Sequence, residues 1–137
     1  MTTEEYRGPI PSVSSDTEEY WKGLLAHKLV LPKCNDCGKV SFPPRRFCPH
    51  CMSFDVTWTE MSGRGKVHTF SVVYQNKSPG FAEKVPYTVG FIELDEGPQM
   101  MSNVIDADPE SVAIGDRVQI VYQDVMPDLT IPLFRPA

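Results

Sequence analysis

The sequence predicts a mainly β protein, in which an N-terminal helix and a small metal-binding ribbon precede a small antiparallel barrel. Its length of 137 residues suits one domain, or two very small ones that share a core. The 13 prolines are roughly twice the usual 5% of a chain, and they favour short strands and turns over long helices. Four cysteines in two close pairs indicate a metal site.

Composition argues against several classes of protein. Hydrophobic residues form 41% of the chain and charged residues 23%, as in ordinary globular proteins. The sequence lacks a basic-then-apolar leader, and it lacks an apolar run of about 20 residues, the length that a bilayer span needs. We therefore expect a cytoplasmic protein that does not cross a membrane. The net charge of −5 also argues against a histone-like basic protein.

Basic residues gather in the middle of the chain. Residues 22–66 hold eight bases and three acids, for a net charge of +5, whereas residues 1–21 carry −4 and residues 67–137 carry −6. Two interpretations remain open at this point. The cations offset the negative charge of a thiolate metal site, or they form a surface that binds anions.

The N-terminal segment is expected to form a flexible arm and one helix. Residues 1–14 are polar and interrupted by prolines, which is typical of an extended arm. Ser15 and Glu18 have the spacing of a capping box, and Pro32 ends the helical pattern, so we predict a helix over residues 15–31. Its apolar face packs on the rest of the chain or docks on a partner, and it comprises Tyr20, Trp21, Leu24, Leu25 and Leu29.

Residues 32–54 contain two Cys-x-x-Cys pairs with ten residues between them. Each pair forms a tight knuckle that directs both sulfurs toward one metal ion, and Gly38 suits the left-handed turn after the first pair. Iron would satisfy the same geometry as zinc, whereas disulfides would require export from the cell. A site with four protein ligands has no open position for water, so we predict a rubredoxin-like ribbon with structural zinc, bound by Cys34, Cys37, Cys48 and Cys51.

Residues 55–137 carry a β signal. Short runs rich in β-branched and aromatic residues alternate with turn sequences rich in glycine and proline, and no helix-length pattern separates them, which excludes a doubly wound α/β sheet. A small closed or partly open antiparallel barrel fits this pattern, because closure removes exposed sheet edges. The OB-fold is the barrel that best suits five or six strands in this length. We expect strands at residues 67–74, 87–94, 100–105, 118–122 and 129–134.

No catalytic residues are assigned. The metal site uses all four cysteines, so no catalytic thiol remains, and His27 and His68 have no nucleophilic partner in a recognisable motif. Gly63-Arg64-Gly65 lacks the third glycine of a dinucleotide-binding loop, and the chain contains no P-loop. The sequence therefore favours a binding or accessory role.

The order of these parts resembles the acyl-CoA-associated zinc-ribbon OB-fold family, known as domain of unknown function 35. The resemblance covers nearly everything after residue 15, and its motifs are specific in combination. The stretches that carry it are Leu31–Cys34, Arg45–Cys51, Gly63–Val67, Val85–Gly97, Ile114–Val118 and Pro132–Pro136.

The resemblance implies a non-catalytic subunit of a thiolase-type complex that cleaves or forms C–C bonds on acyl-CoA thioesters. The thiolase-like partner would hold the catalytic residues, zinc would hold the ribbon together, and the barrel would help bind the acyl or pantetheine part of a shared coenzyme A thioester. Within this hypothesis the loop of residues 75–86 is a candidate wall for that group, with Phe81 at its middle. Candidates to bind the CoA phosphates are Lys39, Arg45, Arg46 and Lys66.

Two other functions compete with this hypothesis. Zinc ribbons and OB barrels also bind single-stranded nucleic acid, which requires a basic groove with aromatic stacking platforms. The basic ribbon agrees with such a groove, but the net charge of −6 over residues 67–137 works against binding a polyanion. The second alternative is an electron carrier with iron in the four-thiolate site.

Overall fold

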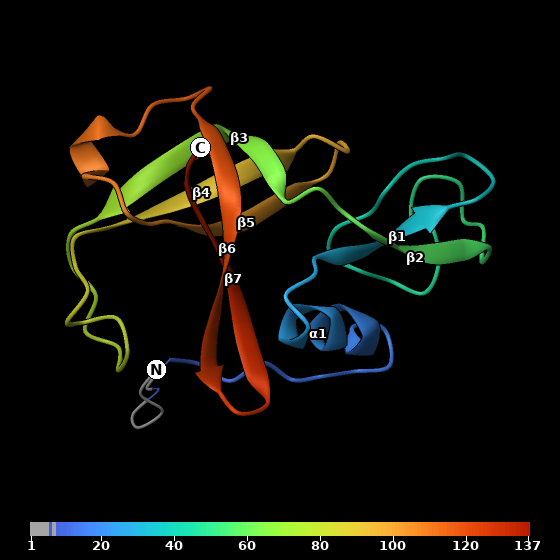
Figure 1. Ribbon diagram of the computed structural model, residues 1–137, viewed down its shortest axis with the longest axis horizontal. Helices are drawn as coiled ribbons and strands as arrows, with labels where there is room; N and C mark the ends of the chain where they lie inside the picture. The colour runs from blue at the N-terminus through green and yellow to red at the C-terminus, as the bar shows by residue number, and fades with distance from the viewer. Residues whose placement is uncertain (1–5, 7) are drawn as a thin grey trace.

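The computed structural model describes Tyr6 and residues 8–137. It has a ribbon domain beside a barrel, with the helix α1 packed below both (Figure 1). Of the predicted arm, residues 1–5 and 7 lie outside the described residues, and residues 8–13 form no helix or strand. No helix in the described part of the chain is long and apolar enough to cross a membrane.

The helix α1 spans Glu18–Leu25, so it is shorter than predicted. The capping box is wrong, because the N-cap is Thr17 and no side chain caps the helix. At the other end the amide of Lys28 donates to the carbonyl of Gly23, at 2.8 Å, and His27 takes a positive φ of 58°. The helix therefore ends well before Pro32, which lies within a strand.

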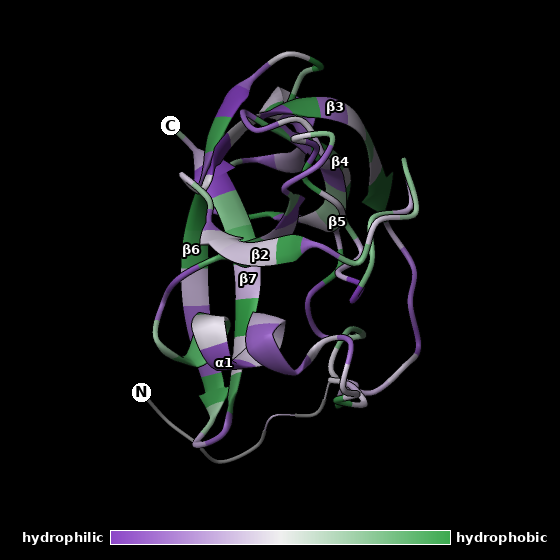
Figure 2. Cartoon of the chain, turned by 90° about the vertical axis from the view of Figure 1, so that its right-hand side faces the viewer, coloured by the Kyte–Doolittle hydropathy of each residue, from purple (hydrophilic) through white to green (hydrophobic). Residues whose placement is uncertain are grey.

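One face of α1 packs against the rest of the chain, which is the first of the two alternatives given for its apolar residues. Tyr20 and Leu24 are buried in the main hydrophobic cluster, which Leu29 joins just after the helix. Leu25, predicted to share this face, is 43% exposed. Figure 2 shows α1 beside β7 (Leu129–Pro136), below the ribbon strand β2 (Val56–Glu60).

The ribbon contains a two-stranded antiparallel sheet. Its strands are β1 (Val30–Cys34) and β2, and Cys34 pairs with Val56 at the end nearest the cysteines. The predicted boundary at residue 55 assigned β2 to the barrel segment, whereas the structure pairs it with β1. The change between the two sheets therefore falls after Glu60.

The barrel has five strands, which close in the order β3-β4-β5-β7-β6. The prediction of a wholly antiparallel barrel is wrong at one seam, where Val104 of β5 pairs in parallel with Phe134 of β7. Directions cannot alternate all the way around a ring with an odd number of strands, so one neighbouring pair must be parallel. Besides β7, the strands are β3 (Arg64–Val73), β4 (Tyr87–Leu94), β5 (Gln99–Val104) and β6 (Arg117–Met126).

The barrel closes tightly at one end and opens at the other. At the closed end a Cβ on Gly65 would lie 2.4 Å from the carbonyl oxygen of Glu93, so only glycine fits between β3 and β4. β3 pairs with β6 only over Arg64–Lys66. Beyond these pairs the β6–β7 hairpin continues away from the barrel (Figure 1), which leaves room for a cavity between it and the ends of β3 and β4.

Polar and aromatic contacts hold the hairpin against the helix end. His27 Nε2 lies 3.0 Å from Asp124 Oδ1, and its ring stacks on that of Tyr122, with centroids 5.1 Å apart. Hydrogen bonds from the Thr130 hydroxyl and then from His27 lower the pKa of Asp124. His27, for which the sequence offered no catalytic partner, therefore ties the end of the helix to β6.

Candidate functional site

The four cysteine sulfurs converge on one point. All lie within 4.8 Å of one another, with Cys34 and Cys51 3.5 Å apart and Cys37 and Cys48 3.6 Å apart. A tetrahedral zinc ion with bonds near 2.3 Å would place its ligands about 3.8 Å apart, whereas a disulfide needs about 2.05 Å. The donor set therefore fits zinc, as predicted.

Two equivalent turns present these sulfurs. The amide of Gly38 donates to the carbonyl of Cys34 at 2.9 Å, and the amide of Met52 donates to that of Cys48 at 2.7 Å. Both residues after the second cysteine adopt positive φ, 79° for Gly38 and 67° for Met52. Each knuckle thus has the same backbone form, although only the first has the glycine that favours it.

The local electrostatics favour a cation at the centre. Backbone N–H groups of Cys37 and then Asp36 lower the pKa of Cys34 to about 7. At Cys51 the N–H of Ser53 favours the thiolate, but the neighbouring sulfurs, that of Cys34 first, outweigh it and raise the pKa to about 12. Four thiolates this close repel one another, and a divalent metal removes that cost.

Hydrogen bonds around the site join the first knuckle to the second. Asn35 Nδ2 donates to Asp55 Oδ1 and to Thr57 Oγ1, each at 2.9 Å, and the Ser53 hydroxyl donates to Asp36. These hydrogen bonds hold the cysteine-bearing turns in place. All four positions around a tetrahedral metal would be filled by sulfur, so the site would be closed to water and structural.

A second feature is a cavity of about 650 Å³ at the open end of the barrel. The arm, the loop after β3, the ends of β4 and β5, and the β6–β7 hairpin all contribute to its wall. Most of the wall is apolar, which is typical of sites for small organic molecules. The lining includes Tyr6, Pro9, Pro11, Trp21, Phe81, Lys84, Pro86, Tyr87, Thr88, Asn103, Val104, Ile105, Gln123, Val125, Ile131 and Leu133.

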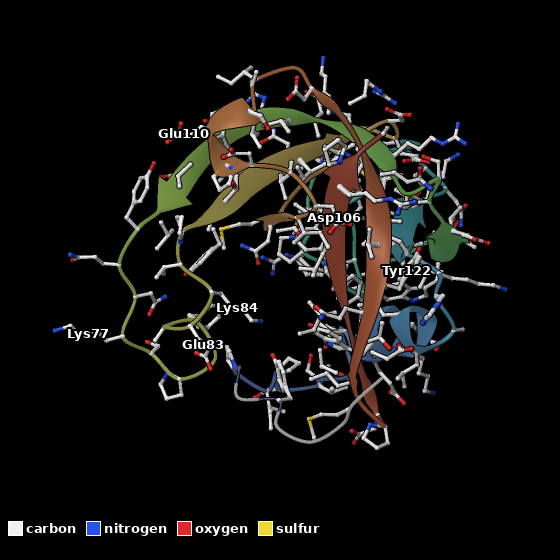
Figure 3. The ribbon with its side chains drawn as sticks, turned by 60° about the vertical axis from the view of Figure 1, so that its left-hand side comes forward. Lys77, Glu83, Lys84, Asp106, Glu110 and Tyr122 are labelled. Carbon is white, nitrogen blue, oxygen red and sulfur yellow. The ribbon has the colours of Figure 1, made fainter. Side chains whose placement is uncertain are left out.

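A few polar groups interrupt this apolar wall. Asn103 Nδ2 donates to the carbonyl of Thr88 at 2.9 Å. Asn76, in the loop after β3, donates to the Tyr87 hydroxyl at 2.8 Å and so anchors the loop. In Figure 3 Lys84 lies on the same loop and points toward the space that the hairpin bounds. The cavity therefore combines a hydrocarbon-like surface with one cation and a small set of hydrogen-bonding groups.

The structure separates the residues predicted to bind coenzyme A. Phe81 lines the cavity, with its ring centroid 5.9 Å from that of Tyr87. None of the four predicted cations is among the lining residues. Arg46 donates to the Ser15 hydroxyl at 3.4 Å. The ribbon carries Lys39, Arg45 and Arg46, all exposed, and β3 carries the exposed Lys66.

Sequence reasoning missed the polar residues of the cavity, among them Lys84, Thr88 and Asn103. Lys84 falls inside the loop that was predicted to form the wall, so its position in that loop was a usable signal. Thr88 gave no such signal, because a threonine in a strand is ordinary. Only the closed barrel places it among the lining residues of the cavity.

Comparison with known proteins assigns both parts of the chain. Two family models match it: "ChsH2, rubredoxin-like zinc ribbon domain" over residues 21–57, and "ChsH2, C-terminal OB-fold domain" over residues 58–123. A "DUF35 domain-containing scaffold protein" from Methanothermobacter thermautotrophicus is 34% identical, over 81% of this chain and 84% of that protein. The chain belongs to the DUF35 family. The predicted zinc ribbon followed by an OB-fold is thus confirmed.

A solved structure extends this likeness to three dimensions. A chain of the "Ltp2-ChsH2(DUF35) aldolase" superposes with a TM-score of 0.84 at 32% identity, covering 93% of this chain and 98% of that one. Another DUF35 structure, from Sulfolobus solfataricus, has a TM-score of 0.64 at 19% identity, which supports the fold alone.

Two further relatives match this chain over only part of their own length. A "Probable enoyl-CoA hydratase alpha subunit" from Thermomonospora curvata is 33% identical over 94% of this chain, but the match spans only 40% of that protein. A "Benzoylsuccinyl-CoA thiolase subunit BbsA" from Thauera aromatica is 29% identical over 68% of this chain and 62% of its own length. The names of these relatives refer to acyl-CoA enzymes, and more than one reaction is represented.

Proposed function

We propose that this DUF35 protein is a non-catalytic subunit of a thiolase-type complex that cleaves or forms C–C bonds on acyl-CoA thioesters. It binds a thiolase-like catalytic subunit and contributes part of the site for the shared coenzyme A thioester. The observation that carries the proposal is the near-complete superposition on a chain of the Ltp2-ChsH2(DUF35) aldolase. The BbsA relative, named as a thiolase subunit, supports it.

The cavity is where we place the acyl or pantetheine group. Its wall is mainly apolar, it holds Phe81 of the predicted loop, and its volume of about 650 Å³ lies within the usual range for organic ligands. Lys84 adds a cation at this wall. The exposed cations Lys39, Arg45 and Arg46 of the ribbon remain candidates for the CoA phosphates.

Zinc has a structural part in this proposal. The four cysteines would hold one ion and keep the ribbon in shape beside the barrel, and no step of the reaction passes through it. Cysteines that bind a metal instead of forming disulfides are typical of reducing compartments, so this four-cysteine site also supports a cytoplasmic location.

Co-expression with a thiolase-like protein encoded by a neighbouring gene tests the proposal. We expect a stable complex on size exclusion, and turnover of a 3-oxoacyl-CoA by the complex but not by either chain alone. Full activity of the thiolase-like chain without this protein would contradict the accessory role. In the same material, salt-sensitive binding of a labelled oligonucleotide would instead support the nucleic-acid alternative.

A paired substitution tests the phosphate site separately. Arg45→Ala with Arg46→Ala should weaken the affinity of the complex for free coenzyme A by about tenfold if both guanidinium groups contact phosphate. Lys77→Ala is the matched control, since this exposed lysine points away from the cavity in Figure 3. Unchanged affinity in the double variant would remove these arginines from the site and leave the subunit assignment in place.

A further inference from the structure

Most of the cavity wall is held in place by hydrogen bonds. Strands β4 and β5 belong to the ladder of the barrel. The β6–β7 hairpin is tied to the end of α1 by the contact between His27 and Asp124. The loop after β3 is anchored by the hydrogen bond from Asn76 to the Tyr87 hydroxyl. These three parts of the wall are therefore fixed to the rest of the molecule.

The arm supplies another side of the wall and is held differently. Residues 8–13 form no helix or strand, and Gly8, Pro9 and Pro11 line the cavity. In Figure 1 the arm leaves α1 and runs past the β6–β7 hairpin toward the loop after β3. Among the described residues no hydrogen bond joins residues 8–13 to the barrel, and the bond from the Tyr6 hydroxyl to the carbonyl of Pro9 stays within the arm. This segment can therefore leave the wall at a lower cost than the hydrogen-bonded parts.

The amino-acid sequence of this segment favours movement as one stiff piece. Proline fixes its own φ and biases the residue before it toward extended backbone, so Pro9 and Pro11 also restrict Gly8 and Ile10. Both prolines line the cavity, whereas Ile10 between them is 67% exposed. Proline has no N–H group, so a change of position leaves no backbone donor to satisfy at these two residues. The segment thus behaves as a semi-rigid spacer.

The base of the segment, in contrast, is fixed. The N–H of Ser14 donates to Thr17 Oγ1 at 3.0 Å, and the N–H of Thr17 donates to the carbonyl of Ser14 at 3.1 Å. This turn lies directly before α1, and Arg46 of the ribbon donates to the hydroxyl of Ser15 at 3.4 Å. A fixed turn beside a segment without such bonds is the arrangement of a hinge.

We propose that residues 8–13 form a strap, which opens about the turn at residues 14–17 and controls how fast a ligand enters and leaves the cavity. In the closed position Pro9 and Pro11 complete the apolar wall. Opening breaks no hydrogen bond to the barrel, but it exposes apolar surface, which keeps the closed position favoured. The inference holds for any apolar ligand of the cavity, so it goes beyond the proposed function and does not depend on it.

The test measures the rates at which anilinonaphthalene sulfonate, a dye that fluoresces in apolar sites, binds to the zinc-loaded full chain in stopped flow. The chain has two tryptophans, of which Trp21 lines the cavity and Trp58 does not. All proteins compared therefore carry Trp58→Phe. Energy transfer from Trp21 to the dye then reports dye that is bound at the cavity.

Loosening the strap should speed both directions of binding. Pro9→Ser with Pro11→Ser should raise the association and the dissociation rate constants by about tenfold each, because the strap then spends more time open. A chain that lacks residues 2–13 should show at least the same increase. Ile10→Ser with Val13→Ser is the matched control in the same segment, since both side chains are exposed and neither residue lines the cavity. It should leave both rate constants unchanged.

Several results would overturn the strap. The main hydrophobic cluster contains no residue of the segment 8–13, so every variant should keep the Tm of the Trp58→Phe parent, and a lower Tm of the shortened chain would make the arm a structural part of the barrel. Faster dissociation with unchanged association would reduce the two prolines to ligand contacts. Unchanged rate constants in both variants, or no energy transfer from Trp21 in any protein, would also reject the strap as an entry gate. None of these results bears on the assignment of the chain as a subunit.

Discussion

The ribbon and the barrel are stabilised in different ways. In the ribbon the buried residues are few: Leu31, Pro32 and Cys34 of β1, and between residues 35 and 60 only Ser41, Pro44 and Cys48. The ribbon therefore adds little to the apolar core, and we expect it to depend on the metal that its sulfurs fit. The main hydrophobic cluster lies mostly in the barrel, although Tyr20 and Leu24 of α1 and Leu31 of β1 join it. Its barrel members include Val67, Ile92, Leu94, Met100, Val118 and Phe134. We therefore expect removal of the metal to unfold the ribbon, and a substitution in the apolar core to destabilise the barrel.

Loss of the metal should cause the largest loss of folded structure, and we expect that loss to be confined to the ribbon. Chelation or Cys48→Ser should unfold residues 30–60, because binding of structural zinc supplies much of the folding free energy of small zinc domains, about 10–16 kcal/mol in zinc-finger peptides. Hydrogen exchange would detect this as loss of protection in β1 and β2, with β4 and β6 still protected. Equal loss of protection in the barrel would show that the two regions do not fold separately. Metal analysis of the wild-type protein should give one zinc ion per chain.

A substitution in the barrel core should destabilise the barrel and leave the metal bound to the ribbon. Ile92→Ala removes a fully buried side chain and should cost about 2–5 kcal/mol of unfolding free energy, measured by urea denaturation. Phe91→Ala is the matched control on the same strand, since Phe91 points outward and is 44% exposed, so it should cost less than about 1 kcal/mol. If Ile92→Ala released zinc before the barrel unfolded, the division between the two regions would be wrong.

The two knuckles allow a smaller test within the ribbon. Gly38→Ala should destabilise the zinc-bound ribbon by about 1 kcal/mol, since alanine resists positive φ although no atom lies within 4 Å of its added Cβ. Met52→Asn should stabilise the zinc-bound ribbon by about 0.5 kcal/mol, because asparagine tolerates the left-handed conformation better than methionine. Competition with a calibrated chelator measures both. Changes of the same sign would contradict the equivalence of the knuckles.

The smallest effect should come from a surface ion pair of the barrel. Arg117 Nη2 lies 2.9 Å from Asp95 Oδ2, and the hydrogen bond from Arg117 lowers the pKa of Asp95. A lowered folded-state pKa stabilises the protein above the ordinary aspartate pKa of about 4, and this contribution is lost as pH falls through the folded-state value. Asp95→Asn should therefore be slightly less stable than the wild type at neutral pH, and the difference should vanish in acid. Thermal melts across that range measure it, and a difference that grows in acid would refute it.

Local patterns predicted the parts of the protein that local physics controls. The spacing of Cys34, Cys37, Cys48 and Cys51 is enough to form two knuckles, whichever strands surround them. Alternating β-branched residues located the barrel strands to within a few residues, because one face of each strand had to be buried. The predicted bounds of the helix were less accurate, since Ser15 and Glu18 fit a capping box that the chain does not form.

Long-range features required the folded chain. Val56–Glu60 looks like any strand, and only its pairing with β1 shows that it belongs to the ribbon sheet. The parallel seam at Val104 follows from closing five strands into a ring, which no local pattern encodes.

The sequence by itself determined the metal site, the class of fold and the absence of a recognisable catalytic motif, because each depends on residue types at short spacing. The tertiary structure alone decided where the cavity lies and what lines it. Arm, loop, strand ends and hairpin come together there from distant parts of the chain. It also left the hydroxyl of Thr88 buried without a hydrogen-bond partner among the described residues, since only packing determines whether a side chain finds a partner.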